Sequence, residues 1–128
     1  MTLTKGTPSA ILSNKTAAAA GATTLTDCTS IDTDASTTLA LEVKVTYGSS
    51  ATLAGTVKVF ASYDDTNFDT DPVEQFDLPF TTNTTKSQTF LLTPAPRYMK
   101  VQVVNNETAE ANKDMTAVYV YMHKQDVS

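Results

Sequence analysis

Apolar and polar residues alternate along several segments of this chain, most regularly between residues 39 and 47. A period of two places every second side chain on the same face of a β-strand, so this pattern predicts a strand with one buried face. The polar face carries Ala40, Glu42, Lys44 and Thr46. The predicted buried face consists of Leu39, Leu41, Val43, Val45 and Tyr47.

The same alternation recurs at 56–63, 76–80, 88–92, 98–104 and 115–122, and each segment is followed or preceded by turn-forming residues. We expect a hairpin-length connection at Gly48 between the first two strands, and a turn over residues 81–86. Prolines in the segment 93–96 are expected to end one strand, because proline fixes its own φ and restricts the residue before it. The predicted inward residues are Val57, Val59, Ala61, Tyr63, Phe76, Leu78, Phe80, Met99, Val101 and Val103.

Residues 1–38 differ from the rest, since Thr, Ala and Ser dominate and bulky apolar residues are scattered. We interpret this segment as an extended N-terminal arm with two weak strands, at 9–12 and 24–28. A short alanine helix over 16–20 is the competing interpretation. The chain is therefore divided into an arm, 1–38, and a core domain, 39–128.

Six clear strands and two weaker ones, separated by turns and without a convincing helix, predict an all-β fold. Polar residues on the second face of nearly every strand favour antiparallel sheets in a sandwich. A jelly-roll-like arrangement is preferred, and an immunoglobulin-like sandwich is the alternative.

Charge and composition exclude several classes of function. The 128 residues carry 14 acidic and 9 basic side chains, a net charge of −5, which does not provide the basic surface that nucleic acid requires. No apolar run approaches the roughly 18 residues that a membrane helix needs. The N-terminus has no basic segment followed by an apolar one, and the chain has a single cysteine, so we expect it to be made and kept in a cytosol.

The densest acidic segment, residues 64–71, is the one candidate for a metal. Asp65, Asn67, Asp69 and Asp71 have the alternating spacing of calcium ligands. Thr70, however, stands where the sharp-turn glycine belongs, and no helices flank the segment. We therefore favour a turn in which Asp and Asn side chains bond to their own backbone.

Other reactive residues are few. Cys28 and His123 lie far apart in the sequence, so we expect Cys28 to be a small buried apolar residue and His123 to be a solvated residue after the last strand. We predict no catalytic residue and no cofactor. Aromatic residues on exposed sheet faces are candidates for a subunit interface or a glycan surface. They are Phe60, Tyr98, Tyr119 and Tyr121.

Two segments carry a family resemblance. Residues 57–70 contain the pattern Ser-x-Asp-x-x-Asn-Phe, starting at Ser62, and residues 96–106 form a strand that opens with Arg97-Tyr98 and closes with Asn. Over about residues 39–122 the chain resembles small β-sandwich structural proteins of tailed bacteriophage virions. Many carbohydrate-binding sandwiches have a similar hairpin with glycine where this chain has Asp65.

The resemblance implies a non-enzymatic virion protein, such as a capsid decoration (cement) protein or another capsid accessory. It implies the major capsid protein or other virion proteins as partners, a homo-oligomer, and a place in virions assembled in the host cytoplasm. The alternative is a carbohydrate-binding module, either on a phage fibre or as a free glycan-binding domain.

Overall fold

A computed structural model describes residues 2–94 and 97–127, and these residues form nine β-strands and no helix. Over this part of the chain there is accordingly no helix long and apolar enough to cross a membrane. The strands are β1 (Leu3–Lys5), β2 (Ser9–Ala17), β3 (Ile31–Asp32), β4 (Ser36–Thr46), β5 (Thr56–Ser62), β6 (Glu74–Asp77), β7 (Thr85–Leu92), β8 (Tyr98–Val104) and β9 (Met115–Val127).

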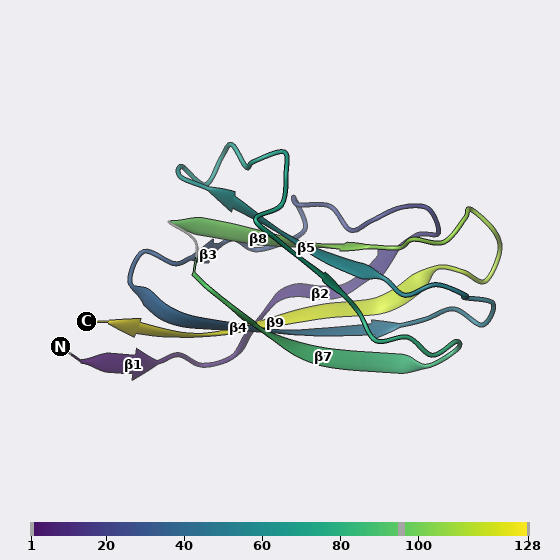
Figure 1. Cartoon of the computed structure of the whole chain (residues 1–128), viewed down its shortest axis with the longest axis horizontal. Helices are drawn as coiled ribbons and strands as arrows, with labels where there is room; N and C mark the ends of the chain where they lie inside the picture. The colour runs from purple at the N-terminus through teal and green to yellow at the C-terminus, as the bar shows by residue number, and fades with distance from the viewer. Residues whose placement is uncertain (1, 95–96, 128) are drawn as a thin grey trace.

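The strands form two antiparallel sheets that pack face to face (Figure 1). In the five-stranded sheet the order is β1-β9-β4-β7, with β2 also paired to β9, and in the four-stranded sheet it is β3-β8-β5-β6. The chain crosses between sheets at every connection from β2 to β9 except the β5–β6 hairpin. With β2 to β9 as eight strands, the two sheets read first-eighth-third-sixth and second-seventh-fourth-fifth, which is the order of a jelly roll.

This order confirms the predicted all-β antiparallel sandwich and decides between its two forms. In an immunoglobulin-like domain, with strands lettered A to G in chain order, one sheet has the order A-B-E-D and the other has the order C-F-G. The observed strand orders do not match this arrangement. The fold is therefore the jelly roll. The expected hairpin between residues 39–47 and 56–63 is wrong, because β4 and β5 belong to different sheets.

The core lies between the sheets and is supplied by the predicted alternation. All five apolar residues of the 39–47 segment are buried, as are Val101 and Val103 of β8. Removing such a side chain from water contributes about 1.5–3 kcal/mol to stability. The prediction that Tyr63 points inward is wrong, since its side chain is 80% exposed and lies just beyond the end of β5.

Both faces of β5 are buried, which the alternating pattern did not predict. Val57 and Val59 face the core, while Phe60 on the other face is also buried. The connection after β5 folds back, with Asp69 N–H donating to the Ala61 carbonyl and Val73 N–H to the Val59 carbonyl.

The first 38 residues are part of the sandwich, so the expectation of a separate arm is corrected. β1 and β2 pair with β9, and β3 pairs with β8. Ile11, Leu12 and Ile31 belong to the core. The scattered apolar residues looked weak in sequence because β2 contains bulges, which break its alternation.

Three local predictions also differ from the structure. Residues 24–28 form a turn rather than a strand, and residues 16–20 contain the end of β2 and a turn rather than a helix. β7 begins at Thr85, inside the expected turn. It ends at Leu92, as predicted, although Ala95 and Pro96 of the predicted break lie outside the described residues.

β9 extends five residues beyond the predicted end at Met122. A register shift near its start separates the pairs Lys44–Tyr119 and Thr46–Thr116, and Ala117 there has a φ of 47°. The bulge resets the alternation, so that Met115 and Val118, three positions apart, are both buried. It thereby turns the side chains of Tyr119 and Tyr121 away from the core.

Candidate functional site

The outer face of the five-stranded sheet gathers aromatic and polar side chains along β9 and β4. The rings of Tyr119 and Tyr121 are parallel, at 1° between planes, with centroids 5.8 Å apart. Lys44, opposite Tyr119 in the register, places Nζ 6.0 Å from the Tyr119 ring centroid. Tyr121 lies opposite Glu42. Because the partially exposed rings are held side by side by the strand, this face is a rigid aromatic platform.

A hollow of about 340 Å³ opens on the same face. Its lining residues are Pro8, Ala40, Glu42, Thr89, Tyr121, Met122 and His123. A second hollow, of about 170 Å³, shares Ala40 and His123 with the first and extends to Leu91. We refer to these two hollows and the tyrosine pair as the outer-sheet surface.

His123 occupies the middle of this surface, which corrects the expectation of a solvated residue after the last strand. It lies within β9, pairs with Ala40 of β4 and lines both hollows. This position could not be predicted from alternation, because His123 and the four residues after it do not alternate between apolar and polar.

Leu91 is the most exposed large apolar residue on the outer-sheet surface, with 83% of its area accessible. It lies on β7, the edge strand of the sheet, and pairs with Ala40. One exposed leucine is ordinary. It lines the second hollow and lies two strands from Tyr121 on the same sheet face, with Ala40, Glu42 and His123 between them. Exposed apolar and aromatic groups gathered on one face are found at protein contacts.

The four aromatic residues predicted as surface candidates fall on two different sheets. Tyr119 and Tyr121 share the outer-sheet surface, whereas Phe60 and Tyr98 belong to the four-stranded sheet. Phe60 is buried, which removes it as an exposed contact residue. The guanidinium of Arg97 lies 4.9 Å from the Tyr98 ring centroid and is also within 3.1 Å of the Asp34 carboxylate.

The acidic loop forms the self-bonded turn that the sequence favoured. Asp64 Oδ1 accepts hydrogen bonds from the N–H groups of Thr66 and Asn67 and from the Ser62 hydroxyl, and Asn67 Nδ2 donates to Asp64 Oδ2. These bonds hold the pKa of Asp64 well below its usual range, the Asn67 and Thr66 N–H groups contributing most. Asp65 has a φ of 61°, the left-handed conformation that favours glycine.

The hydrogen bonds of this loop converge on the carboxylate of Asp64, which is not one of the four residues considered as calcium ligands. In residues 2–94 and 97–127, no group of three or more His, Cys, Asp or Glu side chains is placed to hold a metal ion. A calcium site at Asp65, Asn67, Asp69 and Asp71 stays an untested sequence hypothesis.

Cys28 is buried, as predicted. The Val101 N–H donates to Cys28 Sγ at 3.3 Å. Burial raises the pKa of the thiol, more than this hydrogen bond and the charge of Lys100 lower it. Cys28 thus contacts β8 of the four-stranded sheet, while His123 lies on the outer face of the other sheet, so the two are not arranged as a nucleophile and base.

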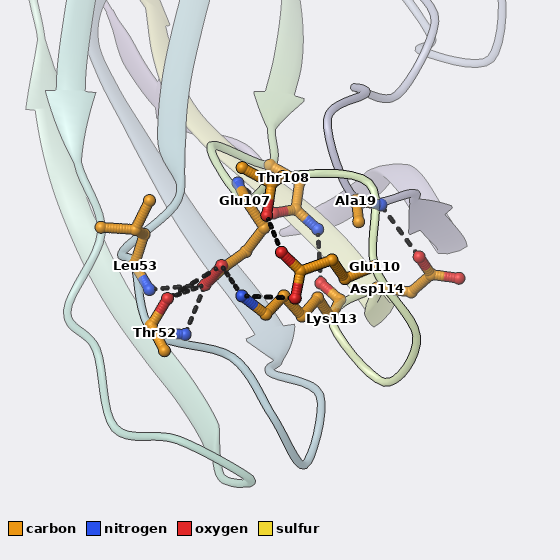
Figure 2. Close-up of polar contacts among 9 residues, drawn as sticks. Ala19, Thr52, Leu53, Glu107, Thr108, Glu110, Lys113 and Asp114 are labelled. Carbon is orange, nitrogen blue, oxygen red and sulfur yellow. Dashed lines mark hydrogen bonds and ion pairs between the residues drawn. The ribbon is translucent and has the colours of Figure 1, made fainter.

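A buried charge cluster that the sequence did not reveal joins loops at one end of the sandwich (Figure 2). The Glu107 carboxylate accepts hydrogen bonds from the main chain of Thr52 and Leu53 and lies 3.7 Å from Lys113 Nζ. Asn105 closes the cluster, since its Oδ1 accepts from the Glu107 N–H and its Nδ2 donates to the Lys113 carbonyl. Burial raises the pKa of the Glu107 carboxyl. The N–H groups of Thr52 and Leu53 and the charge of Lys113 lower it by more, so the pKa lies below its ordinary value.

The carboxylate of Glu107 is therefore fully occupied by its neighbours, and the cluster has a structural role. Within the polar segment 107–114, Glu107 carried no pattern to separate it from the exposed acids around it. The pairing of residues 107 and 52 depends on the fold bringing two distant loops together.

No protein-family model matches the chain, and no curated protein sequence matches it. Among solved structures, a protein of Bacillus endospore appendages, described as disulfide-linked pili, is similar at 17% identity with a TM-score of 0.44, covering 99% of this chain and 90% of that one. Tobacco streak virus coat protein is similar at 14% identity with a TM-score of 0.33, covering 99% and 88%. With values this low, the jelly-roll assignment rests on the strand order of this chain.

Proposed function

We propose that this chain is a non-enzymatic structural protein that works by contact with other protein subunits through the outer-sheet surface. The observation that carries the proposal is that the Tyr119–Tyr121 pair, the hollows at His123 and the exposed Leu91 lie on one sheet face. Protein interfaces combine aromatic and apolar groups with polar ones, and here Glu42 and His123 lie among the aromatic and apolar residues.

The specific form of this role that we propose is a capsid decoration protein or another capsid accessory of a bacteriophage virion. The proposal draws on the resemblance of residues 57–70 and 96–106 to such proteins. A surface presented by a rigid sheet suits repeated contacts with symmetric neighbours, because little conformational entropy is lost on binding. The partners would be the major capsid protein or other virion proteins.

The test is binding to purified virus particles assembled without this chain. The intact chain is expected to co-sediment with them, and Tyr121→Ala combined with Leu91→Ser is expected to abolish most of the binding. Tyr63→Ala is the matched control, because it removes a tyrosine that is 80% exposed away from this surface. Unchanged binding by the double variant, or no binding by the intact chain, contradicts the proposal.

A second candidate is glycan binding, which the parallel tyrosine rings favour. Sugar rings pack on exposed aromatic faces, and Glu42, Thr89 and His123 line the adjacent hollow with groups able to bond hydroxyls. A glycan array separates the two functions. Binding to a defined glycan that disappears in Tyr121→Ala and persists in Tyr63→Ala would favour this candidate over protein contact.

A further inference from the structure

β7 has one edge that pairs with β4 and one edge that pairs with no other strand of the described residues. β7 is the last strand of the five-stranded sheet beside β4, and Figure 1 shows it at the margin of that layer. The strand has eight residues. Long edge strands with unpaired backbone groups are ready templates for pairing with another strand, and proteins usually protect them.

The register shows which backbone groups are free. Tyr47 N–H donates to the Thr84 carbonyl, so these two residues form a hydrogen-bonded pair. Hydrogen-bonded and non-bonded pairs alternate along an antiparallel ladder, and the β4–β7 register has no shift. The residues of β7 that bond to β4 are thus Lys86, Gln88, Phe90 and Leu92. The residues whose N–H and C=O groups point to the free edge are Thr85, Ser87, Thr89 and Leu91.

Charge favours a second copy of this chain as the occupant. Two copies with a net charge of −5 each repel one another over most of their surface. β7 contains no acidic residue and one basic residue, Lys86. This edge is therefore a place where two copies approach without opposed carboxylates.

The sequence of β7 also complements itself in one antiparallel register. With a twofold axis at Gln88, Thr85 pairs with Leu91 of the second copy and Ser87 pairs with Thr89, so that every free N–H and C=O group of the strand is used. Lys86 then lies opposite Phe90, whereas a register centred on Lys86 would oppose two ammonium groups. Gln88, which is exposed, meets its own copy with an amide that can both donate and accept.

We infer that two copies of this chain associate through β7 in this register, forming one continuous sheet across the two sandwiches. Edge-to-edge pairing is a common mode of recognition, and a twofold axis is the commonest symmetry of soluble oligomers. The inference rests on the proposed assembly role and names a second copy as one partner.

Sedimentation velocity of the full chain over a concentration series tests the association. A concentration-dependent dimer is expected. Gln88→Lys and Gln88→Glu are each expected to lose the dimer, because the axis opposes two like charges, and an equal mixture of the two variants should restore it. A chain that is monomeric at every concentration overturns the inference, as does a dimer that persists in both single variants.

Cross-linking tests the register independently. The two Gln88 residues form a non-hydrogen-bonded pair, with Cα atoms about 4.5 Å apart, which lies within the range for a disulfide. Gln88→Cys should form a reducible dimer under mild oxidation. Thr85→Cys is the matched control on the same strand, and it should not cross-link because its symmetry mate is far away. Cross-linking of Thr85→Cys but not of Gln88→Cys overturns the register.

These results are distinguishable from failure of the proposed function. Loss of the dimer with retained particle binding removes the β7 inference and leaves the contact function. A β7 dimer that does not bind particles supports the inference and removes the virion role.

Discussion

The Glu107 carboxylate accepts a hydrogen bond from the Leu53 N–H at 2.7 Å, although the two residues are 54 positions apart. This bond and its neighbours join the β4–β5 connection to the β8–β9 connection (Figure 2). Glu107→Ala leaves the N–H groups of Thr52 and Leu53 and the charge of Lys113 without this partner. We expect a loss of about 1–3 kcal/mol in the free energy of unfolding, measured by urea denaturation.

Glu110→Gln is the control for that measurement. Glu110 also contacts Lys113, but its side chain is 61% exposed, and exposed ion pairs contribute little. We expect a change within about 0.5 kcal/mol. Equal effects of the two substitutions would show that Glu107 is not the centre of the cluster.

The lowered pKa of Asp64 should make the free energy of unfolding depend on pH. Its pKa in the folded chain lies below the ordinary value of 3.8, since N–H groups of Asn67 and Thr66 bond to the carboxylate. The stabilisation is present above about pH 4 and is lost as the pH falls through the folded pKa. In urea denaturation between pH 7 and pH 2, Asp64→Asn should therefore show a smaller decline than the native chain. An unchanged decline would remove Asp64 as a contributor.

The backbone conformation of Asp65, in the same loop, indicates that glycine at this position would stabilise the fold. Its φ of 61° costs energy for a residue with a Cβ atom, and glycine adopts this conformation without that cost. We expect Asp65→Gly to raise stability by up to about 1 kcal/mol, seen as a higher melting temperature. A lower melting temperature would mean that the carboxylate of Asp65 contributes more than the backbone strain costs.

We expect the thiol of Cys28 to react slowly with thiol reagents in the folded chain. Desolvation raises its pKa, and the side chain is 3% exposed, so little reactive thiolate is available at neutral pH. A thiol reagent should leave the folded chain unmodified and react once with the chain in urea. Rapid modification of the folded chain would place the thiol at the surface.

Much of the fold could be predicted from local alternation, and the differences arise where distant segments meet. The pattern at 39–47 needs only one buried face, so it gave the strand and its core residues. Phe60 is buried although it lies on the second face of β5, and the loop after β5 folds back along that strand. Ile11 is buried because its strand, β2, pairs with β9, which begins more than one hundred residues later.

The candidate surface could be predicted in part. Tyr119 and Tyr121 were identified from alternation in the last strand, and the structure places them together. His123 was missed because β9 continues through polar residues, whose pairing is set by β1 and β4 rather than by burial. Glu107 was missed because its partners come from another loop.

Hydroxyl-radical footprinting of the chain, free and bound to virus particles, tests the contact function most directly. This measurement reports the exposure of individual side chains. We predict that modification of Tyr119, Tyr121, His123 and Leu91 falls on binding, while that of Tyr63 and Leu53 stays unchanged. Protection confined to Tyr63, Leu53 and the four-stranded sheet, with Tyr121 and Leu91 modified as in the free chain, would contradict the account.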